Sequence, residues 1–212
     1  LASSINDLNV RRREFDNKIT EEALAMIEQD KILRNSKSTV LFNENWHKGV
    51  IGIVASRLTD SYYRPTIVLT RSNNLITGSA RSIKNFDIYD AIDNCSDLLE
   101  HFGGHKYAAG LSLKPENLEE FTRRFEEYVA NNIDKEELVP ELNVDMEINF
   151  SDITPKFVRV LKQFAPFGPG NMAPVFLSRK SISSTGCAAQ DVSMRSAIPS
   201  NANFLSFIMF LP

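Results

Sequence analysis

The chain has 212 residues, of which 42% are hydrophobic, and this length and composition suit one medium-sized globular domain or two small ones. A formal net charge of -3 at pH 7 argues against a surface coated with basic residues for nucleic acid, so any phosphate binding must come from a local cleft. No apolar run reaches the roughly 20 residues that a spanning helix needs, which argues against a membrane protein.

The two cysteines, Cys95 and Cys187, lie far apart and have no metal-ligand spacing. This pattern, with no secretory signal at the start, predicts reduced thiols in a cytoplasmic protein. The sequence begins at Leu1, without a methionine and inside a helix-like pattern. We therefore expect it to be a fragment of a longer polypeptide.

Residues 1–35 are predicted to form one or two amphipathic helices that act as a connecting arm, because apolar residues recur there at roughly helical spacing. These residues are Ile5, Leu8, Phe15, Ile19, Leu24 and Ile27. Thr20, followed by Glu21 and Glu22, predicts a helix N-cap. The arginine run 11–13 could contact phosphate, although such a short charge run is more typical of a solvated helix face.

Residues 36–135 alternate strand and helix patterns in the order β, α, β, β, α, β, α, which predicts an α/β domain with a mixed β-sheet flanked by helices. The expected strands are 38–42, 65–70, 75–79 and 111–113, and the expected helices are 49–62, 88–102 and 116–130. The Asn-rich residues 71–74 suit a hairpin turn. Asp87 is expected to cap the helix that starts at Ile88, with Asp90 completing a box-like start.

The segment 45–49 places an indole (Trp46), an imidazole (His47) and an ammonium (Lys48) at an expected helix N-terminus, where anions bind favourably. A core tryptophan and a satisfied surface histidine explain the same residues equally well. Further along, Ser79, Arg81 and Ser82 stand among small residues and suit a phosphate cradle, since arginine can donate paired hydrogen bonds to phosphate oxygens. A solvated arginine at a strand end is the simpler alternative.

Residues 103–110 contain three glycines and two alanines around His105, which indicates close approach of the backbone to a neighbour. We expect a loop whose amides at Gly103 and Gly104 face an anion, with His105 donating a hydrogen bond beside them. The small residues that would leave room for a ligand or a packed strand are Ala108, Ala109 and Gly110. The alternative is a helix C-cap at Gly103 followed by a tight turn.

His101 and His105 are four residues apart, but the two glycines between them would break the continuous helix that a zinc-binding pair requires, so we expect no metal site there.

Residues 136–180 are predicted to begin a small β domain, after a charged linker at 131–140. The pattern gives a strand at 142–148, a helix near 155–164, a turn at 166–171 and a strand at 175–178. Residues 181–212 contain only Asp191 and Arg195 as charged residues and are rich in serine. We expect this atypical tail to be disordered or not native.

Four of these motifs occur in the order seen in the RecJ family, which the chain resembles over roughly residues 1–180. They are Trp46–Leu58, Tyr63–Thr66, Gly78–Ser82 and Gly103–Gly110. The resemblance implies an interdomain helical linker at 1–35, a DHH-associated domain at 36–135 and the start of an OB-like domain at 136–180. It also implies a bacterial 5′ to 3′ exonuclease of the DHH phosphoesterase superfamily, specific for single-stranded DNA and active in DNA repair and recombination.

The resemblance further implies that Ser79 and Arg81 hold the nucleic-acid phosphate, particularly a 5′ end, and that His105 acts catalytically by holding or polarising the phosphate under attack. The expected substrate-binding residues are Trp46, His47, Ser79, Arg81, Ser82, Gly103, Gly104, His105, Ala108, Ala109 and Gly110. In this superfamily manganese or magnesium, held by an N-terminal DHH domain, activates the attacking water. The metal-binding motif is not found in this sequence, so the chain alone is expected to hold no metal, to bind DNA weakly and not to cut it.

The expected partners are single-stranded DNA and, as candidates, a single-strand-binding protein or a helicase; no membrane is expected. One alternative is a phosphodiesterase for short oligonucleotides or cyclic dinucleotides, but the segment after Pro140 favours the exonuclease. The other is a noncatalytic nucleic-acid-binding module like that of alanyl-tRNA synthetases, against which the Trp46–Leu58 motif argues.

Overall fold

The computed structural model describes residues 2–134, 136–178, 193–196 and 207–210. The chain divides into two compact units, Leu1–Pro140 and Glu141–Pro212, and each is described by itself. None of the helices within the described residues is long and apolar enough to cross a membrane.

The first unit is built on a five-stranded mixed sheet in the order β1-β2-β3-β5-β4. Its strands are β1 (Thr39–Phe42), β2 (Thr66–Ser72), β3 (Leu75–Arg81), β4 (Leu99–His105) and β5 (Ala108–Leu113). The pair β1–β2 is parallel and the other pairs are antiparallel. The mixed sheet predicted from the sequence is confirmed, with β4 as an added edge strand that the sequence patterns did not predict.

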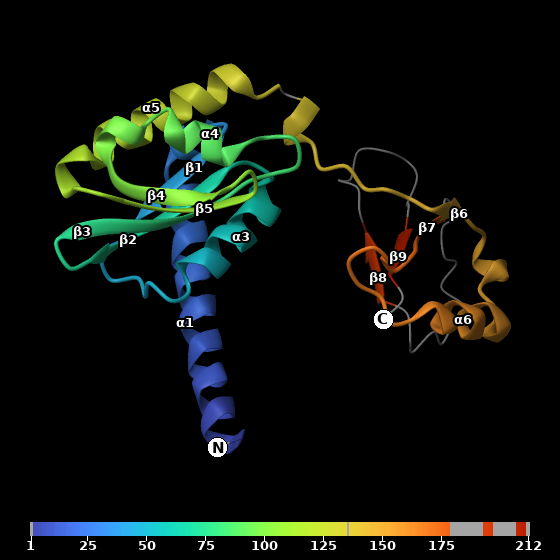
Figure 1. Ribbon diagram of the computed structural model, residues 1–212. Helices are drawn as coiled ribbons and strands as arrows, with labels where there is room; N and C mark the ends of the chain where they lie inside the picture. The colour runs from blue at the N-terminus through green and yellow to red at the C-terminus, as the bar shows by residue number, and fades with distance from the viewer. Residues whose placement is uncertain (1, 135, 179–192, 197–206, 211–212) are drawn as a thin grey trace. The chain divides into compact units, whose positions relative to one another are not determined.

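Helices cover both faces of this sheet: α4 and α5 lie on one side, and α1 and α3 on the other (Figure 1). The helices are α1 (Ala2–Gln29), α2 (Lys31–Asn35), α3 (Ile51–Tyr62), α4 (Ile88–Asp93) and α5 (Leu118–Asn132). Short 3₁₀ turns occur at Ser96–Leu98, Pro115–Asn117 and Glu136–Leu138. The first half of α1 extends beyond the sheet (Figure 1).

Two apolar clusters hold these layers together. On the α4/α5 side, Phe121, Phe125 and Val129 of α5 are fully buried, as the helical spacing predicts. On the α1/α3 side, buried residues of α1 and α3 pack with Val68 and Trp46. Full burial of each large apolar side chain stabilises the fold by about 1.5–3 kcal/mol. Because β2 lies between both clusters, its residues 66–70 are all buried, which explains why its centre, residues 67–69, is apolar on both faces.

Several local signals in the sequence are confirmed. Asp87 caps α4 by accepting from the amides of Tyr89 and Asp90. A two-residue turn, Asn73-Asn74, joins β2 to β3, with Asn73 at a φ of 56°, a left-handed conformation that asparagine tolerates.

Three predictions of local structure are wrong. The helix expected at 88–102 ends at Asp93, and residues 99–105 instead form β4, which pairs with β5 as a hairpin. The segment 103–110 is therefore not a loop; its glycines are strand residues, and glycine disfavours a continued helix. Thr20 does not cap a helix, because α1 runs on to Gln29 and the Thr20 hydroxyl donates to Asp16 one turn earlier (3.5 Å).

One ion pair and two hydrogen bonds join the C-terminal half of α1 to α3 and to the loop before it. Buried Asp16 forms an ion pair with Arg57 (2.8 Å). One turn and a half further on, the Trp46 indole donates to Glu22 (2.9 Å). The Tyr62 hydroxyl donates to Glu28 (2.9 Å). We call α1 and α2 together the arm.

Arg64 fixes the end of the arm to the sheet. Its guanidinium is buried and donates to the Thr39 hydroxyl (2.7 Å) and to the carbonyl oxygen of Arg34 (3.3 Å). Burial lowers its pKa. The segment Tyr63–Thr66, which carried part of the family resemblance, thus has a structural role: it ties the arm to β1.

In the described part of the second unit, a four-stranded sheet in the order β6-β7-β9-β8 is accompanied by the helix α6. The elements are β6 (Met146–Glu147), α6 (Pro155–Leu161), β7 (Val175–Ser178), β8 (Ser193–Ser196) and β9 (Phe207–Phe210), with 3₁₀ turns at Phe150–Asp152 and Lys162–Phe164. The expected helix near 155–164 and the strand 175–178 are confirmed, whereas the strand expected at 142–148 is shorter. Two strands lie within 181–212, and the rest of that segment, with Cys187, is outside the described residues.

Candidate functional site

The strand register brings the predicted site residues into two parallel rows on the α1/α3 side of the sheet. Ser79 lies opposite Val68 of the α1/α3 cluster, and its other neighbours across the sheet are Gly110 and then Gly103. The next row on the same face runs from Arg81 through Ala108 to His105. Adjacent strands are about 4.8 Å apart, so the backbones of Arg81 and His105 are separated by about 10 Å.

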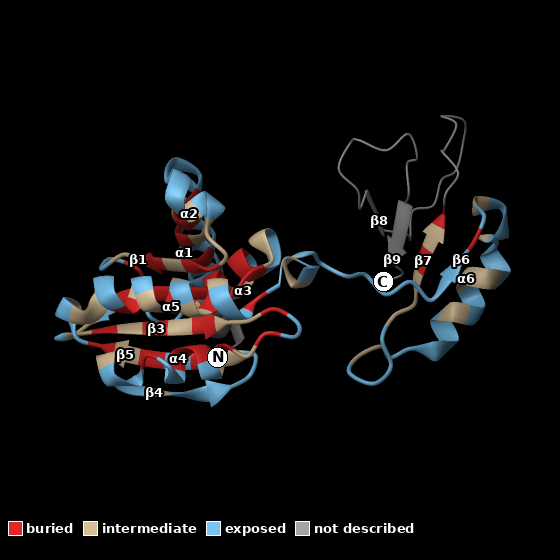
Figure 2. Ribbon diagram, turned by 90° about the horizontal axis from the view of Figure 1, so that it is seen from above, coloured by how far each residue is buried: buried red, intermediate tan, exposed pale blue. Residues whose placement is uncertain are grey.

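This face of the sheet is open over β5 and β4. Helix α3 packs mainly on β2 and β3, and Gly103, His105 and Gly110 are exposed. Figure 2 shows β4 as the exposed edge strand. The open part of the face is therefore a floor of glycine and alanine with Arg81 and Ser79 at one side and His105 at the other.

The two neighbouring glycines of β4 are glycine for different reasons. Gly104 has a φ of +155°, and a Cβ there would lie 2.5 Å from Ala109 Cα and collide with the Ala108 carbonyl oxygen. Gly103 has no such restriction, because a Cβ would meet nothing within 4 Å. A Cβ on Gly110 would meet only the Gly78 carbonyl oxygen, at 3.9 Å. The fold thus requires glycine at 104 but leaves free space above 103 and 110.

Arg81 and Ser79 form a preassembled pair at the start of α3. Arg81 Nη1 donates to Ser79 Oγ (2.9 Å) and to the Ala80 carbonyl oxygen (2.7 Å). A Cβ on Gly52, in the first turn of α3, would lie 3.0 Å from Arg81 Nη2 and 3.1 Å from Ser79 Oγ. The helix N-terminus, which carries partial positive charge, therefore lies directly against the guanidinium.

The guanidinium of Arg81 brings a positive charge to the edge of the open face. Within the described residues no carboxylate pairs with it, and its half-buried position lowers its pKa through desolvation. Arginine nevertheless stays protonated at neutral pH. A half-buried, unpaired cation beside a helix N-terminus favours an anionic ligand.

His105 is held so that it can donate a hydrogen bond. Its Nδ1 accepts from the Tyr107 amide (3.2 Å), which in the neutral ring leaves the proton on Nε2. His47 has the same arrangement, with Nδ1 accepting from the Gly49 amide (3.0 Å). Both imidazoles are exposed and present Nε2 as a donor.

Some of the predicted site residues do not lie on the open face. Trp46 is buried in the α1/α3 cluster and serves the arm through Glu22. The Ser82 hydroxyl is used inside its own loop, donating to the Phe86 carbonyl oxygen (2.9 Å). Gly104 and Ala109 pair with each other across β4 and β5, and they face the opposite side of the sheet, where Ala109 is buried in the α4/α5 cluster.

Sequence reasoning missed Gly52, whose small size lets α3 approach Arg81 and Ser79. A glycine inside a predicted helix was the available signal, because glycine there weakens the helix unless packing requires it.

The described residues provide no metal centre. No group of three or more His, Cys, Asp or Glu side chains is placed to hold an ion in this part of the chain. His101 and His105 lie on one strand face, four residues and so about 13 Å apart. On a strand the two rings are separated further than they would be one turn apart on a helix.

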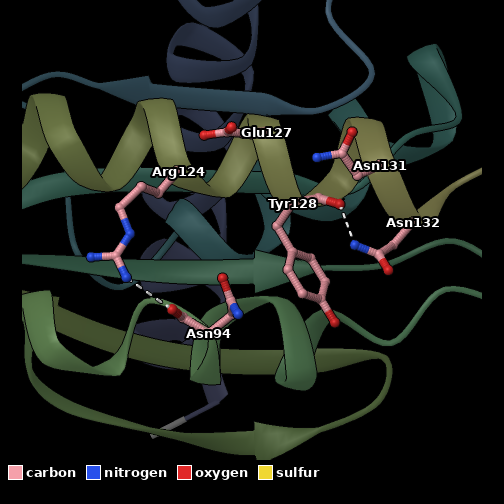
Figure 3. Close-up of a pocket in the computed structure, with 6 residues that line it drawn as sticks. All are labelled: Asn94, Arg124, Glu127, Tyr128, Asn131 and Asn132. Carbon is pink, nitrogen blue, oxygen red and sulfur yellow. Dashed lines mark hydrogen bonds between the residues drawn. The ribbon is translucent and has the colours of Figure 1, made fainter.

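A separate polar pocket lies on the opposite side of the sheet, between α5 and the end of α4 (Figure 3). It is lined by Asn94, Arg124, Glu127, Tyr128, Asn131 and Asn132. Arg124 is already bound to Asp97 (2.8 Å) and to the Asn94 carbonyl oxygen (3.1 Å). Its cation is neutralised, so the open face remains the better candidate for an anionic ligand.

Comparisons with known proteins agree with this picture. The DHHA1 domain matches residues 35–131 and the RecJ OB domain matches residues 144–210. A curated relative, the single-stranded-DNA-specific exonuclease RecJ of Bacillus subtilis (strain 168), is 36% identical over 184 residues, covering 86% of this chain and 23% of its own length. The chain spans between 23% and 32% of the length of the first curated relatives.

Two solved structures of RecJ from Thermus thermophilus resemble the chain. The complex with Mg²⁺ gives a TM-score of 0.72 at 30% identity, covering 82% of this chain and 26% of that one. The complex with Mn²⁺ gives 0.75 at 26% identity, covering 91% and 28%.

Proposed function

Because the chain belongs to the RecJ family, we propose that its first unit is the phosphate-binding part of a 5′ to 3′ exonuclease specific for single-stranded DNA. The observation that carries the proposal is the glycine floor at Gly103 and Gly110. The fold leaves space above both residues, and that space lies between the Arg81–Ser79 pair and the His105 donor. A phosphate with its nucleotide fits the chemistry of these surroundings.

We assign different roles to the Arg81–Ser79 pair and to His105. Arg81 and Ser79 hold the oxygens of a 5′-terminal phosphate, assisted by the N-terminus of α3. His105 donates from Nε2 to the phosphate under attack and stabilises the charge that grows on its oxygens. Hydrogen bonds to a charged group contribute about 1.5–3 kcal/mol each, so loss of one corresponds to roughly a 10- to 150-fold effect.

The described residues include no group of His, Cys, Asp or Glu side chains that would fit a metal ion. RecJ structures from Thermus thermophilus hold Mg²⁺ or Mn²⁺. In the proposed function the whole protein uses manganese or magnesium, held by residues other than those described in this chain. The residues of the open face therefore bind and orient the phosphate and stabilise the charge that grows on its oxygens, but hold no metal.

The rest of the proposal concerns the whole protein. Its role is removal of single strands in DNA repair and recombination, together with a single-strand-binding protein or a helicase. The match of the RecJ OB domain to residues 144–210 supports an exonuclease over a phosphodiesterase for short oligonucleotides. That second domain type adds binding surface for a longer strand.

The test compares 5′-phosphorylated and 5′-hydroxyl single strands with the whole protein that carries this chain. Affinity is measured by fluorescence anisotropy at low salt, and turnover at saturating DNA. The wild type is expected to prefer the phosphorylated strand, and Arg81→Ala to lose that preference roughly 10- to 150-fold. His105→Ala is expected to reduce turnover more than affinity.

The matched control is Arg123→Ala on α5, an exposed arginine paired with Glu120 and Glu127 far from the open face. It should leave both quantities unchanged. Normal turnover at saturating DNA in both Arg81→Ala and His105→Ala would overturn the assignment.

A further inference from the structure

An exposed pair of rings lies next to the phosphate-binding residues. Phe15 of α1 and His47 stack with ring centroids 5.6 Å apart and an interplanar angle of 24°. Phe15 is 50% exposed although it is a large apolar side chain, and His47 is exposed as well. We call these two residues the ring pair.

The ring pair and the phosphate-binding pair share one neighbour, the beginning of α3. The His47 ring lies over Gly49, where a Cβ would be 3.0 Å from its Cε1. Three residues later, Gly52 approaches Arg81 and Ser79. The ring pair therefore borders the first turn of α3, close to where Arg81 would hold a terminal phosphate.

Two arginines continue this surface along α1. Arg11 and Arg12 precede Phe15 by four and three residues and so lie on its face of the helix, whereas Arg13 is turned about 160° away. All three are exposed, and none pairs with a carboxylate among the side chains that the structure describes. The guanidinium groups of Arg11 and Arg12 beside the ring pair thus form no ion pair with any side chain that the structure describes.

We propose that the ring pair stacks a base near the 5′ end of the single strand, and that Arg11 and Arg12 contact the backbone phosphates beyond it. This inference rests on the proposed function, because it takes the strand to begin at Arg81. Aromatic rings bind unpaired bases by stacking without regard to sequence, and cations follow the backbone. An apolar protein partner would leave the two guanidinium groups without neutralising charge, so the strand fits the surface better.

The stacking is tested by abasic substitution in a 5′-phosphorylated strand, one position at a time, with the whole protein in EDTA to prevent cleavage. In the wild type one position within the first few nucleotides should weaken binding by roughly 5- to 150-fold, the usual effect of losing one stacked base. Phe15→Leu should weaken binding of the intact strand by a similar factor and become insensitive to that position. Phe15→Trp should keep the sensitivity.

The charge contacts are tested by the salt dependence of binding. Arg11→Gln and Arg12→Gln should each reduce the slope of log affinity against log salt by about 0.7, the value for one phosphate contact on a single strand. Arg13→Gln is the matched control, since it removes the same charge from the far side of the helix, and its slope should equal that of the wild type.

The outcomes separate this inference from the proposed function. If Arg81→Ala loses the 5′-phosphate preference but Phe15→Leu keeps the abasic profile of the wild type, the ring pair does not stack a base and only the further inference fails. If Phe15→Leu instead lowers the melting temperature of the whole protein without changing binding, the face is packed against another part of that protein, which also overturns the inference. Failure of the Arg81→Ala prediction removes the proposed function itself.

Discussion

Alanine at Gly104 and alanine at the adjacent Gly103 should have opposite effects on the stability of the folded chain. Gly104→Ala places a Cβ 2.5 Å from Ala109 Cα, on a backbone with a φ of +155°. The conformation costs about 1–3 kcal/mol and the overpacking about as much again. A loss of about 3 kcal/mol corresponds to a fall in melting temperature of roughly 10 °C for a domain of this size.

Gly103→Ala should instead be neutral or stabilising in the free protein. Its Cβ meets nothing within 4 Å, and alanine in a strand is favoured over glycine by about 0.5–1 kcal/mol. The same methyl group would project into the space where we place the nucleotide. Binding of a 5′-phosphorylated single strand should therefore weaken by roughly 5- to 150-fold, which corresponds to an overpacking cost of about 1–3 kcal/mol.

The assay combines thermal unfolding of the 212-residue chain with strand affinity and turnover of the whole protein. Gly110→Ala provides an independent repeat, because its Cβ meets only the Gly78 carbonyl oxygen at 3.9 Å. The reasoning is refuted if Gly103→Ala binds and turns over DNA like the wild type. It is also refuted if Gly103→Ala destabilises the chain as much as Gly104→Ala, because the fold and not the ligand would then require glycine at 103.

Two further predictions concern stability. Arg64→Met removes hydrogen bonds to Thr39 and Arg34 and should lower the free energy of unfolding by about 1.5–3 kcal/mol in urea titrations, while turnover per folded molecule stays unchanged; reduced turnover at full folding would contradict its structural role. Burial raises the pKa of the Cys95 thiol from 9.0 to about 11, so the folded state keeps a proton that the unfolded state has lost in this range. Stability should therefore fall between about pH 9 and 11, and Cys95→Val should remove that part of the fall.

Features decided by neighbouring residues could be predicted from the sequence. The Asp87 cap, the Asn73-Asn74 turn and the buried face of α5 depend on side chains within a few positions of each other. Residues 99–105 were different, because their strand exists only through pairing with β5. Nothing in the local pattern outweighed the helical signal that begins at Ile88.

In the candidate site, too, the residue types could be predicted from the sequence, whereas their arrangement in space could not. The residue types of Arg81, Ser79 and His105 indicated phosphate chemistry, and the family resemblance linked the motifs. Their placement in adjacent rows depends on the register of three strands, which the sequence did not reveal. The different constraints on Gly103 and Gly104 depend on which face each residue presents, so only coordinates could separate them.

The three side-chain contacts between α1 and the α3 side of the sheet affect how the arm can move. Three contacts, made by residues six positions apart on α1, join this helix to α3 and to the loop before it: Asp16–Arg57, Glu22–Trp46 and Glu28–Tyr62. The same helix α3 lies against Arg81. A displacement of the C-terminal half of α1 that keeps these contacts should therefore also move the residues around Arg81. A movement of α1 that preserves the three contacts would therefore bend the helix before Asp16 or carry the arm and the sheet together.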